Sequence, residues 1–83
     1  MKVDVRKKRG NKYNGNVFVD GVNIGELVDC DGRYALLVKD GPKFARYAEF
    51  GGGFPGDSLA EAAFGIRECV AGVEAVSFEG RAL

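Results

Sequence analysis

Closely spaced turn signals are the feature of this sequence that most limits its possible folds. Asx-Gly pairs stand at Asn14-Gly15, Asp20-Gly21 and Asp31-Gly32, and Asp40-Gly41-Pro42 follows. The segments between these turns carry the β-branched and aromatic residues that are typical of strands. We therefore expect residues 16–50 to form a meander of short antiparallel strands.

The Asp20-Gly21 pair gives the sharpest local prediction. Both residue types tolerate the positive φ angles of a type I′ turn, so Val19 and Val22 should flank a tight hairpin. Leu27 does not keep the alternation of the second strand, and a bulge at Gly25 would restore it. Asn14-Gly15 is a competing turn that we rank second, because the two turns together would leave only a four-residue segment between them.

Two further segments complete the predicted meander. The stretch "RYALLVK", residues 33–39, is apolar on both faces, which indicates a central strand covered on two sides. The stretch "KFARYAEF", residues 43–50, follows the Asp40-Gly41-Pro42 turn and should pair as the next strand.

From Leu59 onward the apolar residues recur at the spacing of one helical face. They are Leu59, Ala62, Ala63, Ile66, Cys69, Val70 and Val73. Ser58 and Glu61 have the spacing of a capping box, and Gly72 can end the helix in a left-handed conformation. "VEAVSFE", residues 73–79, alternates enough for a short last strand. We therefore predict one α+β domain over residues 1–83, with a small antiparallel meander of about four strands and one helix packed across it.

The stretch that joins the predicted sheet to this helix resembles a nucleotide-binding loop. Gly51–Ser58 fits the phosphate-loop pattern except that Asp57 stands where the pattern needs Lys. A carboxylate there would repel a polyphosphate by roughly 4 kcal/mol at an effective dielectric of about 20. We interpret the stretch as a strand-to-helix joint, with Asp57 and Ser58 at the positive end of the helix.

The residue content argues against catalysis. The chain has no histidine, and neither Cys30 nor Cys69 has an evident base to activate it. Cys69 falls on the buried helical stripe, and Cys30 lies in "DCDG", which lacks the remaining ligands of a calcium loop. We expect a non-enzyme with no catalytic residues, no cofactor and no metal. Charges replace the apolar core of a secretion signal near the N-terminus, and no apolar run is long enough for a membrane, so we expect a cytoplasmic protein.

The charges are unevenly distributed along the chain. Residues 1–12 hold six basic residues and one acidic residue, and the remaining residues have a net charge of −5. This basic N-terminal segment could neutralise phosphates, and Tyr13 and Phe18 could stack on bases. The candidate nucleic-acid-binding residues are Arg6, Lys7, Lys8, Arg9 and Lys12. The other interpretation is a solvated terminal segment or a charged edge strand.

A second set of residues suggests contact with a protein. On a helical wheel Phe64 lies opposite the apolar stripe, among small and charged residues, and large aromatics dominate interface energetics. One helix covers one face of a sheet, so the second face needs the N-terminal segment, a second copy or another protein as cover. The candidate partner-binding residues are Phe64, Arg67, Glu68, Glu61, Phe18 and Tyr34. The plainer interpretation is that Phe64 is merely half exposed.

The hairpin "VFVDGVNIGEL", the segment "DGRYALLVKDG" and the capped helix "DSLAEAAFGIREC" form a simple meander with one helix. In this pattern the chain resembles small phage-encoded accessory proteins of the anti-CRISPR, anti-restriction and host-takeover kind. The resemblance implies a non-catalytic inhibitor of a host enzyme or defence complex, acting in the host cytoplasm and often as a dimer. This resemblance does not identify any site residues in the chain. We expect a protein-binding inhibitor or regulator, with a small nucleic-acid-binding module as the alternative.

Overall fold

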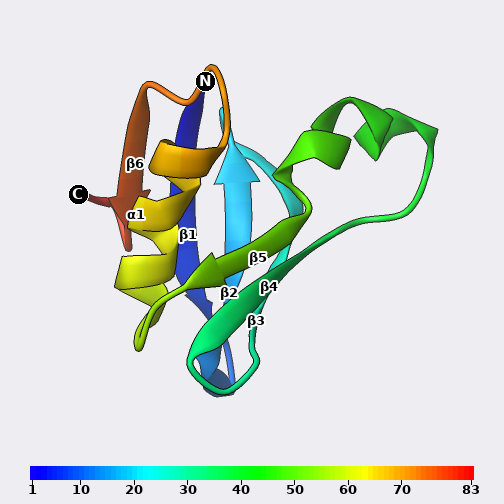
Figure 1. The fold of residues 1–83 in the computed structure, drawn as a ribbon. Coiled ribbons are helices and arrows are strands. Elements are labelled where there is room, and N and C mark those ends of the chain that lie inside the picture. The colour runs from blue at the N-terminus through cyan, green and yellow to red at the C-terminus, as the bar shows by residue number, and fades with distance from the viewer.

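The computed structural model describes all 83 residues except for the side chain of Lys12. The chain forms a mixed seven-stranded sheet in the order β5-β4-β3-β2-β1-β6-β7, with helix α1 (Leu59–Cys69) against one face (Figure 1). The strands are β1 (Lys2–Lys8), β2 (Asn11–Val19), β3 (Val22–Asp29), β4 (Arg33–Val38), β5 (Gly52–Pro55), β6 (Ala75–Phe78) and β7 (Arg81–Ala82). The predicted α+β class is confirmed, but about four strands understates the sheet.

The predicted β2–β3 hairpin is confirmed in its turn and in its bulge. Asp20 and Gly21 have φ angles of 47° and 86°, and Val19 pairs with Val22. The register then shifts, so that Val17 pairs with Gly25 and one residue of β3 is left over as a bulge. The shift lets apolar side chains on both sides of the bulge reach the core.

The competing turn at Asn14-Gly15 is wrong, because both residues lie inside β2. The chain instead reverses at Arg9-Gly10, where Gly10 has a φ of 81°. This turn makes the N-terminal segment the first strand of a hairpin.

The prediction of a solvated or edge N-terminal segment is therefore also wrong. Strand β1 is interior: it pairs with β2 in the antiparallel sense and with β6 in the parallel sense. Val3 and Val5 alternate with charged residues and are fully buried, which is the pattern of a half-buried strand. The predicted short last strand is confirmed as β6.

The prediction of a strand over residues 43–50 is wrong. These residues belong to the 3₁₀ helix η1 (Pro42–Phe50), which extends away from the sheet (green in Figure 1). Phe44, Tyr47 and Phe50 are three residues apart, which is the period of a 3₁₀ helix, and Tyr47 and Phe50 are buried. The strand that pairs with β4 is β5, within the glycine-rich joint.

Strand β4 is interior as predicted, but it is covered on one side only. Tyr34 and Leu36 are buried, whereas Leu37 on the opposite face is 58% exposed. The expectation of cover on both faces is therefore wrong for this strand.

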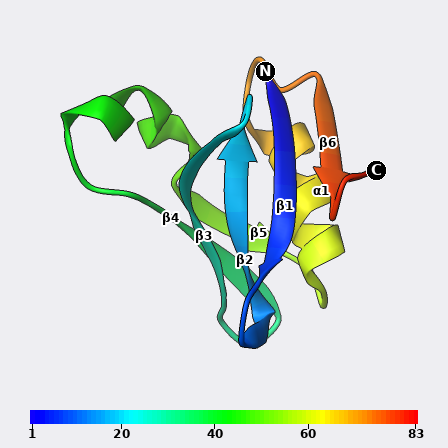
Figure 2. The same ribbon diagram turned by 180° about the vertical axis from the view of Figure 1, so that it is seen from behind.

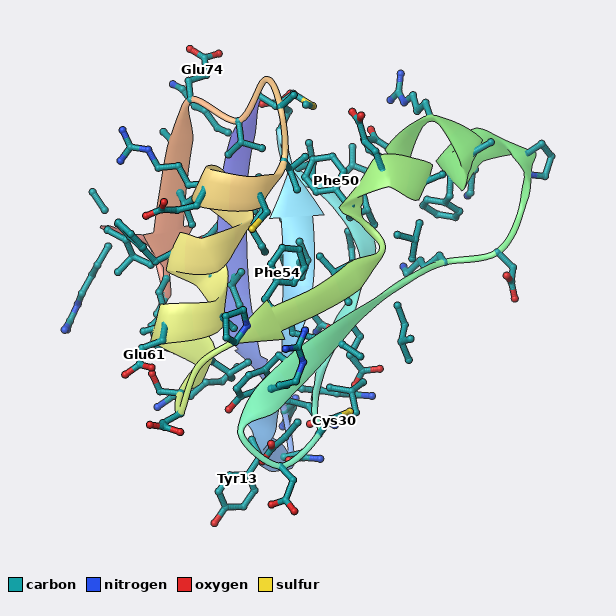
Figure 3. The ribbon with its side chains drawn as sticks, viewed as in Figure 1. Tyr13, Cys30, Phe50, Phe54, Glu61 and Glu74 are labelled. Carbon is teal, nitrogen blue, oxygen red and sulfur yellow. The ribbon has the colours of Figure 1, made fainter. Side chains whose placement is uncertain are left out.

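The core lies between the sheet and α1. Figures 1 and 2 show the sheet curling, so that β5 crosses β2 on the side of α1 and comes close to the helix. Phe54 of β5 fills the space between them (Figure 3). The helix buries four residues: Leu59, Ala62, Ala63 and Ile66.

The end of α1 differs from the prediction. The helix stops at Cys69, because Val70 is already extended, and Gly72 takes its left-handed conformation only after the helix has ended. Cys69 is exposed, so its predicted burial on the helical stripe is wrong. Across the described chain, no helix combines the length and the apolar character needed to cross a membrane.

Candidate interaction surfaces

Helix α1 begins at the predicted cap. The backbone N–H of Glu61 donates to Ser58 Oγ at 3.2 Å, which satisfies one of the free donors of the first turn. The Glu61 carboxylate in turn accepts from the backbone N–H of Asp57 at 2.9 Å, one residue earlier than a standard capping box. This cap fixes where the helix starts and therefore which residues point outward.

The outer face of α1 presents Phe64, which is 45% exposed as the helical wheel predicts. Arg67 and Glu68 are exposed beside it, and within the described part of the chain their side chains have no hydrogen bond or ion pair. We call Phe64 with Arg67 and Glu68 the Phe64 face. Gly65 does not belong to it, because a Cβ there would lie 3.7 Å from Phe54.

Two of the predicted partner-binding residues lie elsewhere. Tyr34 is 5% exposed and faces the core. Burial, together with the carboxylates of Asp29, Asp57 and Glu61, raises the pKa of the Tyr34 hydroxyl above its ordinary value. Phe18 is half-buried on the sheet face that α1 does not cover. The structure brings neither residue to the Phe64 face.

The open sheet face around Phe18 carries several charged side chains. Phe18 borders a surface hollow of about 420 Å³ that is also lined by Lys2, Asp4, Arg6, Asp20 and Ser77. The N-terminal segment does not cover this face, since β1 lies within the sheet. The charged lining explains why this part of the face needs no cover.

Asp4 is the centre of this polar face. Its carboxylate accepts from Ser77 Oγ at 2.5 Å, from Arg6 Nε at 2.6 Å and from the backbone N–H of Gly80 at 3.2 Å. Burial opposes ionisation of Asp4, but these donors outweigh it and hold the pKa of the carboxyl below 3.8. Asp4 thus fastens β1 to the turn between β6 and β7.

The predicted nucleic-acid-binding residues lie on the β1–β2 hairpin, and we call residues 7–13 the basic hairpin. Arg6 pairs with Asp4, and Lys8 Nζ lies 2.9 Å from a carboxylate oxygen of Glu26. The side-chain nitrogens of Lys7 and Arg9 have no carboxylate oxygen within 4.0 Å among the described side chains. Lys12 was also predicted here, and its side chain lies outside the described residues. An open hollow of about 530 Å³ is lined by Lys7, Lys8, Gly10, Asn11 and Tyr13.

A third surface was missed at the sequence level. Residues of β4 and η1, among them Leu37, Phe44, Ala45 and Ala48, line a hollow of about 420 Å³. Lys39 and Lys43 place their ammonium groups 5.6 and 5.2 Å from the centre of the Phe44 ring. The three-residue spacing of aromatics in residues 42–50 was the signal that would have found this surface.

The two edges of the sheet are short. Strand β5 has four residues, and its Pro55 has no N–H to donate to a partner strand. Strand β7 has two residues. Side-chain surfaces are therefore better placed than the sheet edges to bind a partner.

The fold and these surfaces define a small α+β protein with an exposed aromatic on its helix and a basic hairpin at one end. Cys30 and Cys69 are both free and exposed. Among the described residues, no three His, Cys, Asp or Glu side chains are placed to hold a metal ion. Comparison with protein-family models, with curated proteins and with solved structures finds no match to this chain.

Proposed function

We propose that this protein is a non-enzymatic inhibitor or regulator that binds a partner protein through the Phe64 face. The observation that carries the proposal is the 45% exposure of Phe64 on the one α-helix of the fold. A rigid helix that presents an aromatic side chain to solvent offers a ready anchor for a partner's pocket. Arg67 and Glu68 would form the charged rim around this anchor.

The titratable groups support a non-enzymatic role. Asp4 and Tyr34 have shifted pKa values, and a structural cause accounts for each. Asp4 ties β1 to the C-terminal turn, and Tyr34 is a core residue. Neither shift comes from a pair of groups set up for proton transfer.

The resemblance to phage-encoded accessory proteins suggests the partner. It favours a host enzyme or a defence complex in the host cytoplasm, with a second copy of the chain as a further partner. Glu61 and Glu68 would meet basic side chains of the target, while Arg67 would meet an acidic one.

The proposal is tested by Phe64→Asp beside the matched control Leu37→Asp. Both changes put a carboxylate at an exposed apolar position, and Leu37 lies on β4, away from α1. Affinity capture from cells that carry the gene would identify binders by quantitative mass spectrometry. Each candidate would then be purified and titrated against the three proteins, and light scattering would report their oligomeric states.

The expected result is a partner, or a dimer, that the wild type and Leu37→Asp retain and that Phe64→Asp weakens at least about tenfold. Loss of a central aromatic anchor has an effect of this size or larger. If Phe64→Asp keeps the same binders and the same oligomeric state as the wild type, the Phe64 face is not the binding surface.

A further inference from the structure

The basic hairpin offers a second binding surface that is independent of the Phe64 face. We propose that it binds single-stranded nucleic acid, with Lys7 and Arg9 on backbone phosphates and a base stacked on Tyr13. The proposal rests on three observations: the two strands of the hairpin are paired, two of its cations have no ion pair in the described part of the structure, and the Tyr13 ring lines one hollow together with Lys7.

Strand pairing holds the hairpin in shape. Lys7 pairs with Gly15 and Lys8 pairs with Asn11, with a bulge between the two lysines. The backbone N–H of Lys7 also donates to Glu79 Oε1 at 2.9 Å, which anchors the base of the hairpin to the end of β6. These contacts place Lys7 and Arg9 at the end of the paired β1–β2 strands.

The charge of the basic hairpin is one-sided. Residues 7–13 contain four basic residues and no acidic one. Glu26 neutralises Lys8, but Lys7 and Arg9 remain without an ion pair in the described part of the structure. A flexible polyanion gains the most from cations that no carboxylate already engages.

Tyr13 favours a single strand over a duplex. Its ring is 58% exposed and points away from the sheet at the end of the molecule (Figure 3). A duplex keeps its bases stacked inside, whereas a single strand can place a base on an exposed aromatic ring. Tyr13 and the two lysines line one shallow hollow that is open to solvent, so an extended nucleic-acid strand could lie along it.

A second hollow indicates a direction in which the bound nucleic-acid strand would not continue. It shares Lys7 and Tyr13 with the first, measures about 330 Å³ and lies at the start of α1. Asp57 also lines it, and its carboxylate would repel a phosphate. The bound strand should therefore follow the hairpin and not the helix N-terminus.

The test is fluorescence anisotropy with labelled oligo-dT and oligo-U of about 20 nucleotides, longer than the roughly 4–16 that one small domain covers. Binding is expected at about 50 mM salt, with a log–log salt slope between about −1 and −3 for one to four phosphates at about −0.7 each. A duplex of equal length is expected to bind more weakly. Phe64→Asp should bind as the wild type does, which separates this proposal from the previous one.

Charge reversal and ring removal test the two halves of the surface. Lys7→Glu/Arg9→Glu should weaken binding at least about tenfold, whereas Lys39→Glu/Lys43→Glu, the same change in net charge near η1, should weaken it by at most about twofold. Tyr13→Ala should weaken binding about tenfold, and Tyr13→Phe, which keeps the stacking ring, should not. Circular dichroism would confirm that each variant is folded.

Three outcomes would overturn the proposal. The first is no binding at low salt. The second is an equal loss from both charge-reversal pairs, which would show only a general effect of net charge. The third is tighter binding to the duplex, or full binding by Tyr13→Ala, because either result would remove the stacked base from the interaction.

Discussion

Gly25 lies where β3 and β4 approach each other too closely for a side chain. An ideal Cβ at this position would overlap the carbonyl oxygen of Leu37 and lie 3.0 Å from Val38 Cα. Both obstacles are backbone atoms of a paired strand, so no rotamer change can relieve them. Gly25, which follows the bulge residue Ile24 in the β2–β3 hairpin, therefore allows the β3–β4 pairing.

We expect Gly25→Ala to lower the free energy of unfolding by about 2–4 kcal/mol, because the strands must separate to admit one methyl group. The matched control is Gly65→Ala in α1, where the added Cβ would be 3.7 Å from Phe54, an ordinary contact. Helix propensity should make this control as stable as the wild type or up to about 1 kcal/mol more stable. Urea unfolding followed by circular dichroism measures both, and equal stability of the two variants would contradict the close approach.

At the scale of elements, the start of α1 depends on one hydroxyl group. Ser58→Ala should cost about 1 kcal/mol of stability, because the N–H of Glu61 loses its acceptor. Ser58→Asn keeps an acceptor at the same position and should stay within a few tenths of a kcal/mol of the wild type. Thermal unfolding of the three proteins measures the difference. If Asn and Ala are equally destabilising, the side-chain cap is not what stabilises the helix start.

The elements that local chemistry defines were the ones that could be predicted. Asp20-Gly21 fits only a few turn types, and Ser58 with Glu61 marks a helix start on its own. Phe64 was placed outward for the same reason, because a helical wheel needs no tertiary information. Each of these predictions depends only on residues that are a few positions apart in the sequence.

The elements that were missed depend on partners far along the chain. The charges of residues 2–8 predict a basic terminal segment, whereas the alternation of Val3 and Val5 is the pattern of strand β1. Besides Phe54, strand β5 consists of Gly52, Gly53 and Pro55, which have low β-propensity, so that it forms a strand only because β4 lies next to it. The three-residue period of η1 is present in the sequence, but the same residues are also compatible with the alternation of a strand.

At the scale of the whole molecule, the candidate surfaces also combine features that the local sequence predicts with features that depend on distant partners. The sequence could name the basic residues of the hairpin, but not that Glu26 would neutralise Lys8, since that pair requires the register of β1 with β2 and of β2 with β3. It also could not place Tyr34 in the core and Phe18 on the opposite face. The parallel pairing of β1 with β6 brings residues more than 70 positions apart into contact, and no local pattern announces it.

The contribution of Asp4 to the contact between β1 and the β6–β7 region can be measured. Its carboxylate joins β1 to Ser77 and Gly80, and these donors favour the ionised form, so its pKa in the folded protein lies below 3.8. A lowered folded pKa means that the stabilisation is complete above the ordinary value and is lost as the pH falls through the folded one. Asn has the shape of a protonated Asp, so Asp4→Asn should mimic the acid form at every pH.

We therefore expect Asp4→Asn to be about 1 kcal/mol less stable than the wild type at pH 7, which is below the roughly 1.5–3 kcal/mol of charged hydrogen bonds because the side chain is partly exposed. The difference should shrink toward zero as the pH falls below 3.8. Asp40→Asn makes the same chemical change at an exposed position and should change the stability little. Urea unfolding of the three proteins across this pH range measures the effect. A gap between Asp4→Asn and the wild type that stays constant into acid would mean that the charge of Asp4 does not hold β1 to the turn between β6 and β7.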